Sequence, residues 1–188
     1  MQRLGREDLI DGPLPPAFGI AGYKNSGKTT LIVELLRELV SRGWRVGTIK
    51  HAHHAFDIDH PGKDSFLHRT AGATEVIVAS VRRVAHIREL DDSGEPELSE
   101  LLGRMGSLDL VLVEGWKSGN HPRLELRRAA VPATAIAGSV PGVLAIVSET
   151  PLPAEALPVL MRANVPVIAD FILDAVGLPR RRNLQERL

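Results

Sequence analysis

The sequence of 188 residues contains no cysteine, and only 4% of its residues are aromatic. Without cysteine the protein cannot use thiol chemistry, thiolate zinc sites or cysteine-ligated iron–sulfur clusters, and this absence fits a reducing compartment. The chain also lacks net charge, because 23 basic side chains balance 23 acidic ones. General binding to nucleic acids or anionic membranes depends on clustered positive charge, so the balance argues against both. A small polyanion bound at a local site remains compatible with this composition.

Long apolar runs are missing as well. The longest, such as residues 110–113 and 165–168, have the length of a strand and fall far short of the ~20 residues that a membrane-spanning helix needs. Residues 1–16 mix charged side chains with three prolines and lack the apolar core of a signal peptide. We therefore expect a cytoplasmic protein.

Strand and helix patterns alternate along the chain. The apolar run 17–21 is followed by a glycine-containing turn and then by apolar residues at helical spacing from Leu31 to Val40. Gly43 stands where a helix is expected to end, and residues 45–50 resume as a strand. This strand–helix–strand unit predicts parallel pairing.

The rest of the chain continues the alternation. Strands at 123–128 and 143–147 follow a buried strand at 108–113, and the alternating Leu124 and Leu126 suggest that 123–128 is exposed on one side, as a dimer edge or an ordinary sheet edge. Together the patterns predict an α/β domain with helices on both faces of a mainly parallel, twisted sheet. The remaining expected elements are helices at 62–72, 96–105, 154–163 and from Asp170, and strands at 74–79, 81–87 and 165–169, with the pair after Thr74 as a candidate antiparallel edge.

The strongest chemical signal is the sequence GYKNSGKT at residues 22–29, which fits the pattern Gly, four residues, Gly-Lys-Ser/Thr. The strand before it and the helix after it would let backbone N–H groups surround a phosphate at the helix N-terminus. We expect Lys28 to reach the terminal phosphates and the Thr29 hydroxyl to bind Mg²⁺, whereas Lys24 could contact phosphate or solvent. A turn that merely connects strand to helix is the alternative. The predicted fold is therefore a P-loop NTPase-like three-layer sandwich.

A phosphate loop needs an acidic element to hold its metal ion, and strand 108–113 supplies two candidates. Glu114 follows the strand, at the carboxyl edge where ligands gather in open α/β sheets. We expect it to act on Mg²⁺ or on a reacting water. Asp109 lies at the start of the strand, and its favoured role is to cap that start.

Five of the seven histidines lie between residues 51 and 68. Their spacing with nearby carboxylates would allow a zinc or nickel site, and it would also allow a hydrated polar loop. Because this loop begins at the same sheet edge as the phosphate loop, a switch-like segment with Mg²⁺ or water ligands is a third interpretation. Asp59 is the first candidate for metal binding and catalysis there.

These motifs resemble those of the bacterial molybdopterin-guanine dinucleotide biosynthesis protein B family, called MobB. The likeness covers about residues 18–172, and the His-rich loop joined to PGKDS is far more specific than a phosphate loop alone. The matching segments are SGKTTL (26–31), IKHAHH (49–54), DIDHPGKDS (57–65), AGA (71–73), LVLVEGWK (110–117), a basic strand ending in Arg128, AIVSETPL (145–152) and IADF (168–171).

The resemblance implies a homodimer that binds GTP with Mg²⁺, hydrolyses it slowly and assists the guanylyltransferase MobA, which joins GMP to molybdopterin. Preference for guanine is likewise the family's implication. Glu149 ends a strand and could recognise the base or cap a helix entry. The nucleotide-binding residues implied are Gly22, Lys24, Asn25, Ser26, Gly27, Lys28, Thr29 and Thr30, and the loop with His51, His53, His54, Lys63 and Asp64 would face the nucleotide, the cofactor or the partner.

Other functions remain open from the residues themselves. Small-molecule kinases share the phosphate loop, but no segment resembles their arginine-rich lid. A nucleotide-driven metal chaperone would use the His-rich loop, and a purely structural nucleotide is a further alternative. Arg69 and Arg128 are candidates for stabilising a transferred phosphoryl group or for structural ion pairs. We expect a lead-in at 1–16, a single P-loop domain at 17–178 and a basic tail at 179–188.

Overall fold

A computed structural model of the chain describes residues 13–52, 56–91, 94–128 and 135–182. Its contacts divide the chain into two compact units. The first comprises Met1–His51 and Leu98–Leu188, and the second comprises Ala52–Glu97. None of the helices in the described ranges is long and apolar enough to cross a membrane.

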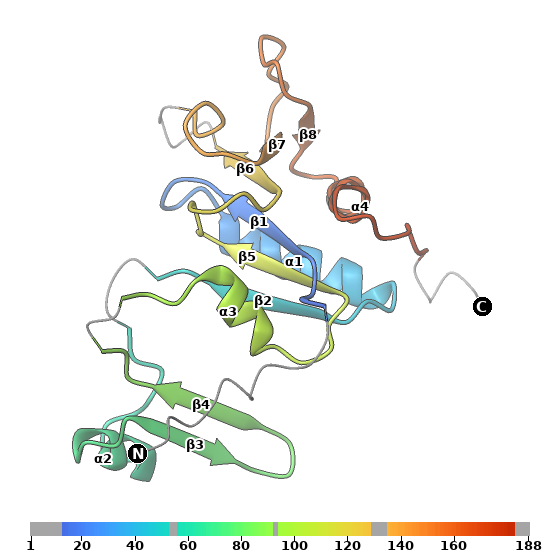
Figure 1. The fold of residues 1–188 in the computed structure, drawn as a ribbon. Coiled ribbons are helices and arrows are strands. Elements are labelled where there is room, and N and C mark those ends of the chain that lie inside the picture. Colours follow the sequence, from blue (N-terminus) through green and yellow to red (C-terminus); the bar gives the residue numbers. More distant parts are fainter. Residues whose placement is uncertain (1–12, 53–55, 92–93, 129–134, 183–188) are drawn as a thin grey trace. The chain divides into compact units, whose positions relative to one another are not determined.

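The first unit is built on a six-stranded sheet in the order β2-β5-β1-β6-β7-β8, in which every neighbouring pair is parallel (Figure 1). Three helices accompany it. The strands are β1 (Ala17–Ala21), β2 (Val46–Lys50), β5 (Leu110–Glu114), β6 (Arg123–Arg127), β7 (Val143–Ser148) and β8 (Val159–Met161), and the helices are α1 (Lys28–Ser41), α3 (Leu98–Gly103) and α4 (Val165–Ala175).

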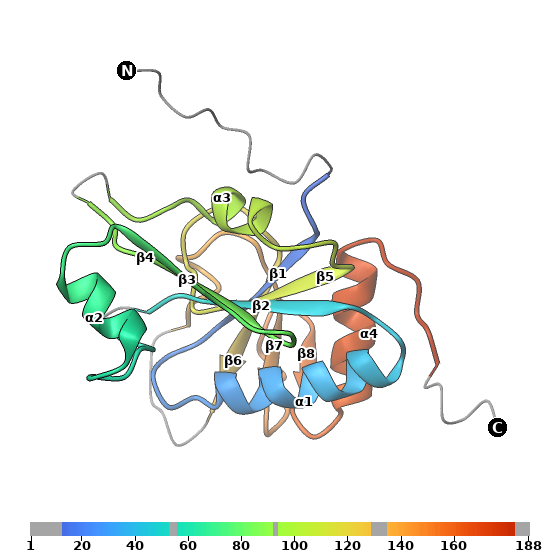
Figure 2. The same cartoon turned by 90° about the horizontal axis from the view of Figure 1, so that it is seen from below.

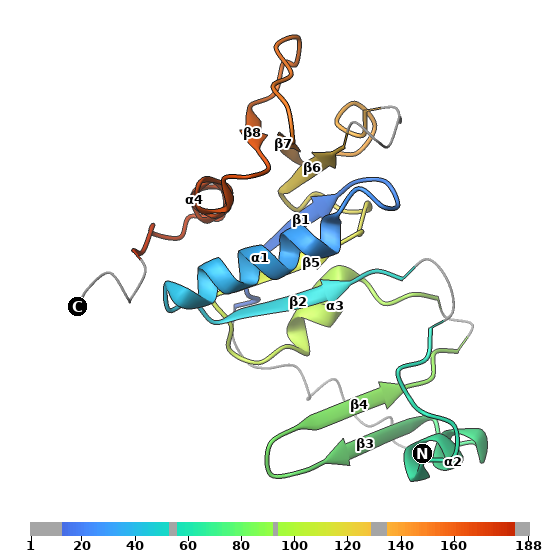
Figure 3. The same cartoon turned by 180° about the vertical axis from the view of Figure 1, so that it is seen from behind.

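The helices cover both faces of this sheet (Figure 2). Alternate residues of β5 point to opposite faces, as the pleat requires. Leu110 and Leu112 belong to the core beneath α1 and α4, whereas Val111 and Val113 belong to the core beneath α3. Figure 3 shows α1 lying along β1 and β5 on one face of the sheet. The predicted α/β sandwich is confirmed.

The strand–helix–strand unit is parallel as predicted, but its two strands are not neighbours, because β5 lies between β1 and β2. The expectation that residues 123–128 form a one-sided edge strand is wrong. Strand β6 lies between β1 and β7, and its residues from Arg123 to Leu126 are buried. The Glu125 carboxylate accepts hydrogen bonds from the N–H groups of Ile136 and Ala137, both at 2.9 Å, and from the Arg127 guanidinium.

Two predictions near the C-terminus are also wrong. Residues 154–163 form no helix but contain β8, which pairs with β7. Residues 165–169 form no strand but the first turns of α4. The Asn164 side chain caps this helix by accepting a hydrogen bond from the Val167 N–H at 3.4 Å, and Pro166 fits the first turn because no N–H is needed there.

The second unit contains α2 (Asp64–Thr70) and an antiparallel hairpin of β3 (Glu75–Ala79) and β4 (Val84–Arg88). The hairpin forms its own two-stranded sheet, so the expected antiparallel edge on the main sheet is wrong. Val76 is the only buried hydrophobic residue in the described part of this unit. A unit with so little core is expected to be only marginally stable on its own.

The connection from β5 to β6, residues 115–122, crosses β1 without a helix. Gly19 of β1 makes room for it: a Cβ there would lie 2.9 Å from both His121 Nε2 and Arg123 Cβ. The side chain of Arg123 is fully buried and fills the inside of the connection. Its guanidinium donates hydrogen bonds to the carbonyl oxygens of Trp116 (3.3 Å), Lys117 (2.7 Å), Ser118 (3.3 Å), Gly119 (2.7 Å) and His121 (3.3 Å).

His121 gives this connection a pH dependence. Burial, with a further contribution from the charge of Arg123, lowers the pKa of His121 to about 4. Unfolded histidine titrates near pH ~6.5, so between that pH and pH 4 protons bind preferentially to the unfolded chain. We expect the free energy of unfolding to fall as pH falls through this window. Urea unfolding followed by fluorescence of Trp44 and Trp116, both in the first unit, measures it.

The variant His121→Asn keeps an acceptor near Nδ1, which contacts Arg123 Nη2 at 3.2 Å, but removes the titrating group. This variant should reduce the dependence of the free energy of unfolding on pH. Exposed His68 provides the control, since His68→Asn should keep the slope of the unsubstituted protein. An equal slope in His121→Asn would contradict the assignment.

Candidate functional site

The loop of residues 22–27 joins β1 to α1 in a conformation that requires glycine at both ends. A Cβ on Gly22 would lie 2.7 Å from Ser26 Oγ and 2.8 Å from the carbonyl oxygen of Leu126, which leaves no room for a side chain. Gly27 precedes the helix with φ of 92°, a left-handed conformation that glycine adopts without strain. The backbone N–H groups of the first turn of α1 therefore face the loop without partners from within the helix. Such a terminus attracts anions.

Lys28 lies over this loop. Its Nζ donates hydrogen bonds to the carbonyl oxygens of Gly22 at 2.9 Å and Tyr23 at 2.7 Å. Burial lowers the pKa of Lys28, while the Glu114 carboxylate acts in the opposite direction. The buried hydroxyl of Ser26 has no hydrogen-bond partner in the described part of the chain. An ammonium and a free hydroxyl beside unpartnered amides fit a bound phosphate.

Thr29 and Glu114 are brought together from distant parts of the chain. The Thr29 hydroxyl donates to Glu114 Oε1 at 2.9 Å, and Lys50 Nζ lies 3.5 Å from the same oxygen. The parallel register places Glu114 opposite Lys50 of β2. Hydroxyl and carboxylate oxygens are the ligands that Mg²⁺ prefers, so this pair fits the ion.

Asp109 lies at the opposite end of β5. Its Oδ2 accepts a hydrogen bond from the Arg45 N–H at 2.8 Å, which confirms the predicted capping of the strand start. The two acidic residues of this strand thus lie at opposite sheet edges. Only Glu114 contacts the phosphate-loop helix.

The predicted site residues did not include Lys50 or Lys117, and Tyr23 was named only as part of the phosphate-loop motif. The Lys117 ammonium lies 5.7 Å from the centroid of the Tyr23 ring, and Tyr23 belongs to the phosphate loop. Their positions in the sequence could have indicated that they lie near the site, because Lys50 ends a strand next to β5 and Lys117 follows Glu114 by three residues. Residues at the carboxyl edge converge on one place in such a sheet.

Of the other predicted site residues, His51 and Glu149 follow strands of the sheet, and three more lie around the phosphate loop. His51 directly follows β2, where its ring lies 4.9 Å from that of Trp116 at a tilt of 41° and its backbone N–H donates to the Glu114 carbonyl. Glu149 follows β7 and pairs with Arg128 at 3.3 Å, both half-exposed. Lys24, Asn25 and Thr30 are exposed around the phosphate loop.

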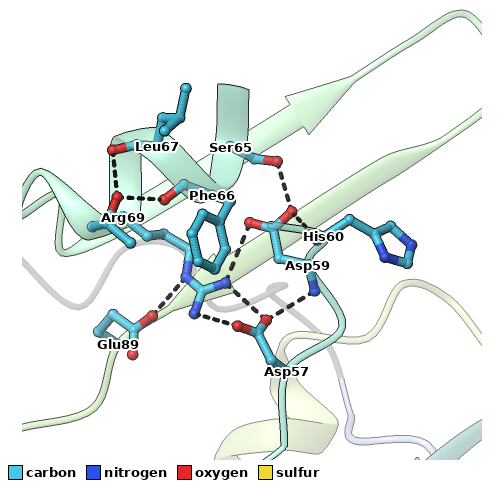
Figure 4. Close-up of polar contacts among 9 residues, drawn as sticks. Asp57, Asp59, His60, Ser65, Phe66, Leu67, Arg69 and Glu89 are labelled. Carbon is cyan, nitrogen blue, oxygen red and sulfur yellow. Dashed lines mark hydrogen bonds and ion pairs between the residues drawn. The ribbon is translucent and has the colours of Figure 1, made fainter. Parts of the chain in front are cut away.

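Asp59 belongs to the second unit and has partners there. Figure 4 shows the Arg69 guanidinium between three carboxylates, from Asp57 at 2.9 Å, Asp59 at 3.2 Å and Glu89 at 2.7 Å. Ser65 Oγ also donates to Asp59, at 2.8 Å. Burial would raise the pKa of Asp59, but its hydrogen bonds outweigh burial and the pKa is lowered. Arg69 thus forms the structural ion pairs that the sequence left as an alternative.

Lys63 and Asp64 mark the start of α2, as its N-cap and first residue. The predicted loop residues His53 and His54 lie outside the described residues. Among the residues that are described, no group of three or more histidine or acidic side chains is arranged to hold a metal ion.

Comparison with known proteins adds independent information. A family model described as molybdopterin guanine dinucleotide synthesis protein B (MobB) matches residues 17–149. The molybdopterin-guanine dinucleotide biosynthesis adapter protein of Escherichia coli (strain K12) is 39% identical over 168 residues, which cover 85% of this chain and 92% of the relative. The protein of the same name from Haemophilus influenzae is 39% identical over 163 residues, which cover 84% and 87%.

Solved structures agree with this assignment. A crystal structure of molybdopterin-guanine biosynthesis protein B is 28% identical and covers 86% of this chain and 99% of its own, with a TM-score of 0.67. The crystal structure of a MobB protein homolog from Bacillus stearothermophilus is 27% identical and covers 86% and 97%, with a TM-score of 0.62. The chain therefore belongs to the MobB family of molybdopterin-guanine dinucleotide biosynthesis adapter proteins.

Proposed function

We propose that the chain is an adapter of molybdopterin guanine dinucleotide biosynthesis that binds Mg-GTP at its phosphate loop and assists a guanylyltransferase of the MobA type. The observation that carries this proposal is the convergence of Lys28, Thr29 and Glu114 at the loop. The names of its relatives supply the pathway.

Each of these groups has a distinct task. The loop amides and the Lys28 ammonium neutralise the phosphates, and the Ser26 hydroxyl donates to a phosphate oxygen. Thr29 and Glu114 hold Mg²⁺, which supplies charge compensation on the terminal phosphates. Asp59 is a candidate ligand that would first have to exchange its bonds to Ser65 and Arg69.

Intrinsic GTP hydrolysis should be slow. Arg69 is held by three carboxylates, and Arg128 pairs with Glu149. Neither of these two arginines is therefore available without breaking its ion pairs, and an arginine directed at the transferred phosphoryl group commonly accelerates such reactions greatly. Slow turnover suits a protein that delivers or positions a nucleotide for its partner.

The His-rich loop completes the proposal. His51 lies beside Glu114 at the end of β2. We place His51, His53, His54, Lys63 and Asp64 in a segment that faces the nucleotide, molybdopterin or the partner enzyme. Glu149, at the end of β7, is the proposed contact to the guanine base.

Calorimetric titration with Mg-GTP and Mg-ATP tests the function. We expect GTP to bind and ATP to bind at least about tenfold more weakly, a difference of roughly 1.4 kcal/mol. Addition of the GTP-bound protein should then stimulate guanylyl transfer by a MobA-type enzyme. Preference for ATP would instead support a kinase or a metal chaperone, and the absence of binding would refute the nucleotide site.

We also propose that the active form is a homodimer, supported by the apolar surface of the hairpin. Ile77 and Val84 are 63% and 67% exposed, and the register places them on one face because Ala79, two residues from Ile77, pairs with Val84. A second copy of the chain would cover this face and supply the core that the second unit lacks.

The double variant Ile77→Arg/Val84→Arg should therefore dissociate the dimer, because it places charge in an apolar contact. Light scattering after size-exclusion chromatography measures the mass. Arg82→Ala, in the exposed hairpin turn, is the matched control and should remain dimeric. A double variant that stays dimeric would place the interface elsewhere.

A further inference from the structure

Tyr23 of the phosphate loop lies between two lysines. Its carbonyl oxygen accepts the 2.7 Å hydrogen bond from Lys28 Nζ, and its ring lies 5.7 Å from the ammonium of Lys117. Lys28 is the residue of this motif that reaches the β- and γ-phosphates. Lys117 also acts electrostatically on Lys28, so its ammonium lies near the residue that reaches these phosphates.

Positive charge is in excess around this point. Lys50 and Lys117 both act on Lys28 electrostatically, and each lowers its pKa further after the effect of burial. Glu114 is the carboxylate that opposes them. The three ammonium groups repel one another, and an anion bound among them would offset this repulsion.

The backbone that carries Lys117 is fixed on both sides. The preceding residue, Trp116, is buried in the core beneath α3. The carbonyl oxygens of Lys117 and Gly119 each accept a 2.7 Å hydrogen bond from the buried Arg123 guanidinium. Lys117 thus extends from an anchored segment, and its orientation toward the loop costs little further loss of backbone freedom.

We propose that Lys117 is a substrate-binding residue that contacts the terminal phosphate of a bound nucleoside triphosphate. It would add a second lysine contact to that of Lys28, from the strand connection that follows Glu114. Because a nucleoside diphosphate lacks the terminal phosphate, Lys117 would distinguish the two nucleotides. This inference rests on the nucleotide site proposed above.

The test compares the affinities of the full-length protein for Mg-GTP and Mg-GDP by calorimetry. Lys117→Ala should weaken GTP about tenfold, the effect of one charge-assisted hydrogen bond, and weaken GDP by less than about threefold. Lys117→Arg, which keeps the charge, should recover most of the GTP affinity. Tyr23→Leu removes the ring beside Lys117 but keeps the main-chain carbonyl, so it should cause a smaller loss of the same kind.

Arg37→Ala is the matched control, because it removes one exposed positive charge from α1 outside the site. It should leave both affinities unchanged. Equal weakening of GTP and GDP in Lys117→Ala, no weakening of either, or the same loss in Arg37→Ala would overturn the inference while the nucleotide site stands. If the unsubstituted protein bound neither nucleotide, the proposed function itself would fail, and the role of Lys117 with it.

Discussion

Replacing Lys28 with alanine should weaken Mg-GTP binding by at least about 100-fold, the loss expected when charge-assisted contacts to two phosphates are removed. The fold should survive. Lys28 makes hydrogen bonds to the carbonyl oxygens of Gly22 and Tyr23, and water can replace it at Tyr23, where the contact is exposed. Its removal also relieves repulsion from Lys50 and Lys117. We expect the free energy of unfolding to change by less than about 1 kcal/mol.

Two measurements on Lys28→Ala check this expectation. Calorimetry gives the affinity for Mg-GTP, and urea unfolding gives the stability. Arg37→Ala, with the same loss of charge on the exposed side of α1, should bind normally. If Lys28→Ala bound GTP like the unsubstituted protein, the phosphate loop would not be the nucleotide site.

The second large effect concerns stability. Arg123→Met replaces a buried guanidinium with a side chain of similar length that cannot donate hydrogen bonds. The carbonyl oxygens of residues 116–119 and 121 would lose these donors inside the protein. Each buried group left unsatisfied costs about 1–3 kcal/mol, although local rearrangement would admit water to some of them. We expect a net destabilisation of about 3–5 kcal/mol and a melting temperature lowered by roughly 10 °C.

Thermal and urea unfolding measure this effect, with Trp116 fluorescence as a probe at the connection itself. Arg45→Met is the matched control. The Arg45 side chain is exposed, and the hydrogen bond to Asp109 comes from the backbone N–H, which the substitution keeps. It should change stability by less than about 0.5 kcal/mol. A comparably small change in Arg123→Met would show that water satisfies these carbonyl groups without the guanidinium.

Local patterns were sufficient to predict the phosphate loop and its surroundings. The spacing of glycines, the apolar run of β1 and the helical periodicity of α1 all refer to residues close in sequence. Glu114 could be placed at the site because it ends an apolar strand, and parallel strands end at a common edge. The contact between Thr29 and Glu114 follows from these two facts.

Nonlocal contacts account for what the sequence did not reveal. The alternation of leucine with charged residues in β6 predicts a half-exposed strand. Arg123 and Glu125 are nevertheless buried, because main-chain groups of other segments form hydrogen bonds with their side chains. The start of α4 was predicted as a strand because a continuous apolar run of this length is too short to show a helical period, whereas the Asn164 cap with Pro166 was the signal for a helix. Lys117 reaches the phosphate loop only because the connection after β5 crosses β1.

The strand order also determines when the phosphate loop can become ordered during protein synthesis. Strand β1 pairs with β5 and β6, so that Ala17 meets Val111 and Ile20 meets Leu124, and β2 pairs with β5. The carbonyl of Leu126 even lies against Gly22 of the loop. Contacts between residues so distant in sequence form slowly, and the ribosome must first translate more than half of the chain. A nascent chain that already contains the complete phosphate-loop sequence thus lacks the strands that shape it, and under the proposed function nucleotide would bind only after β6 has emerged.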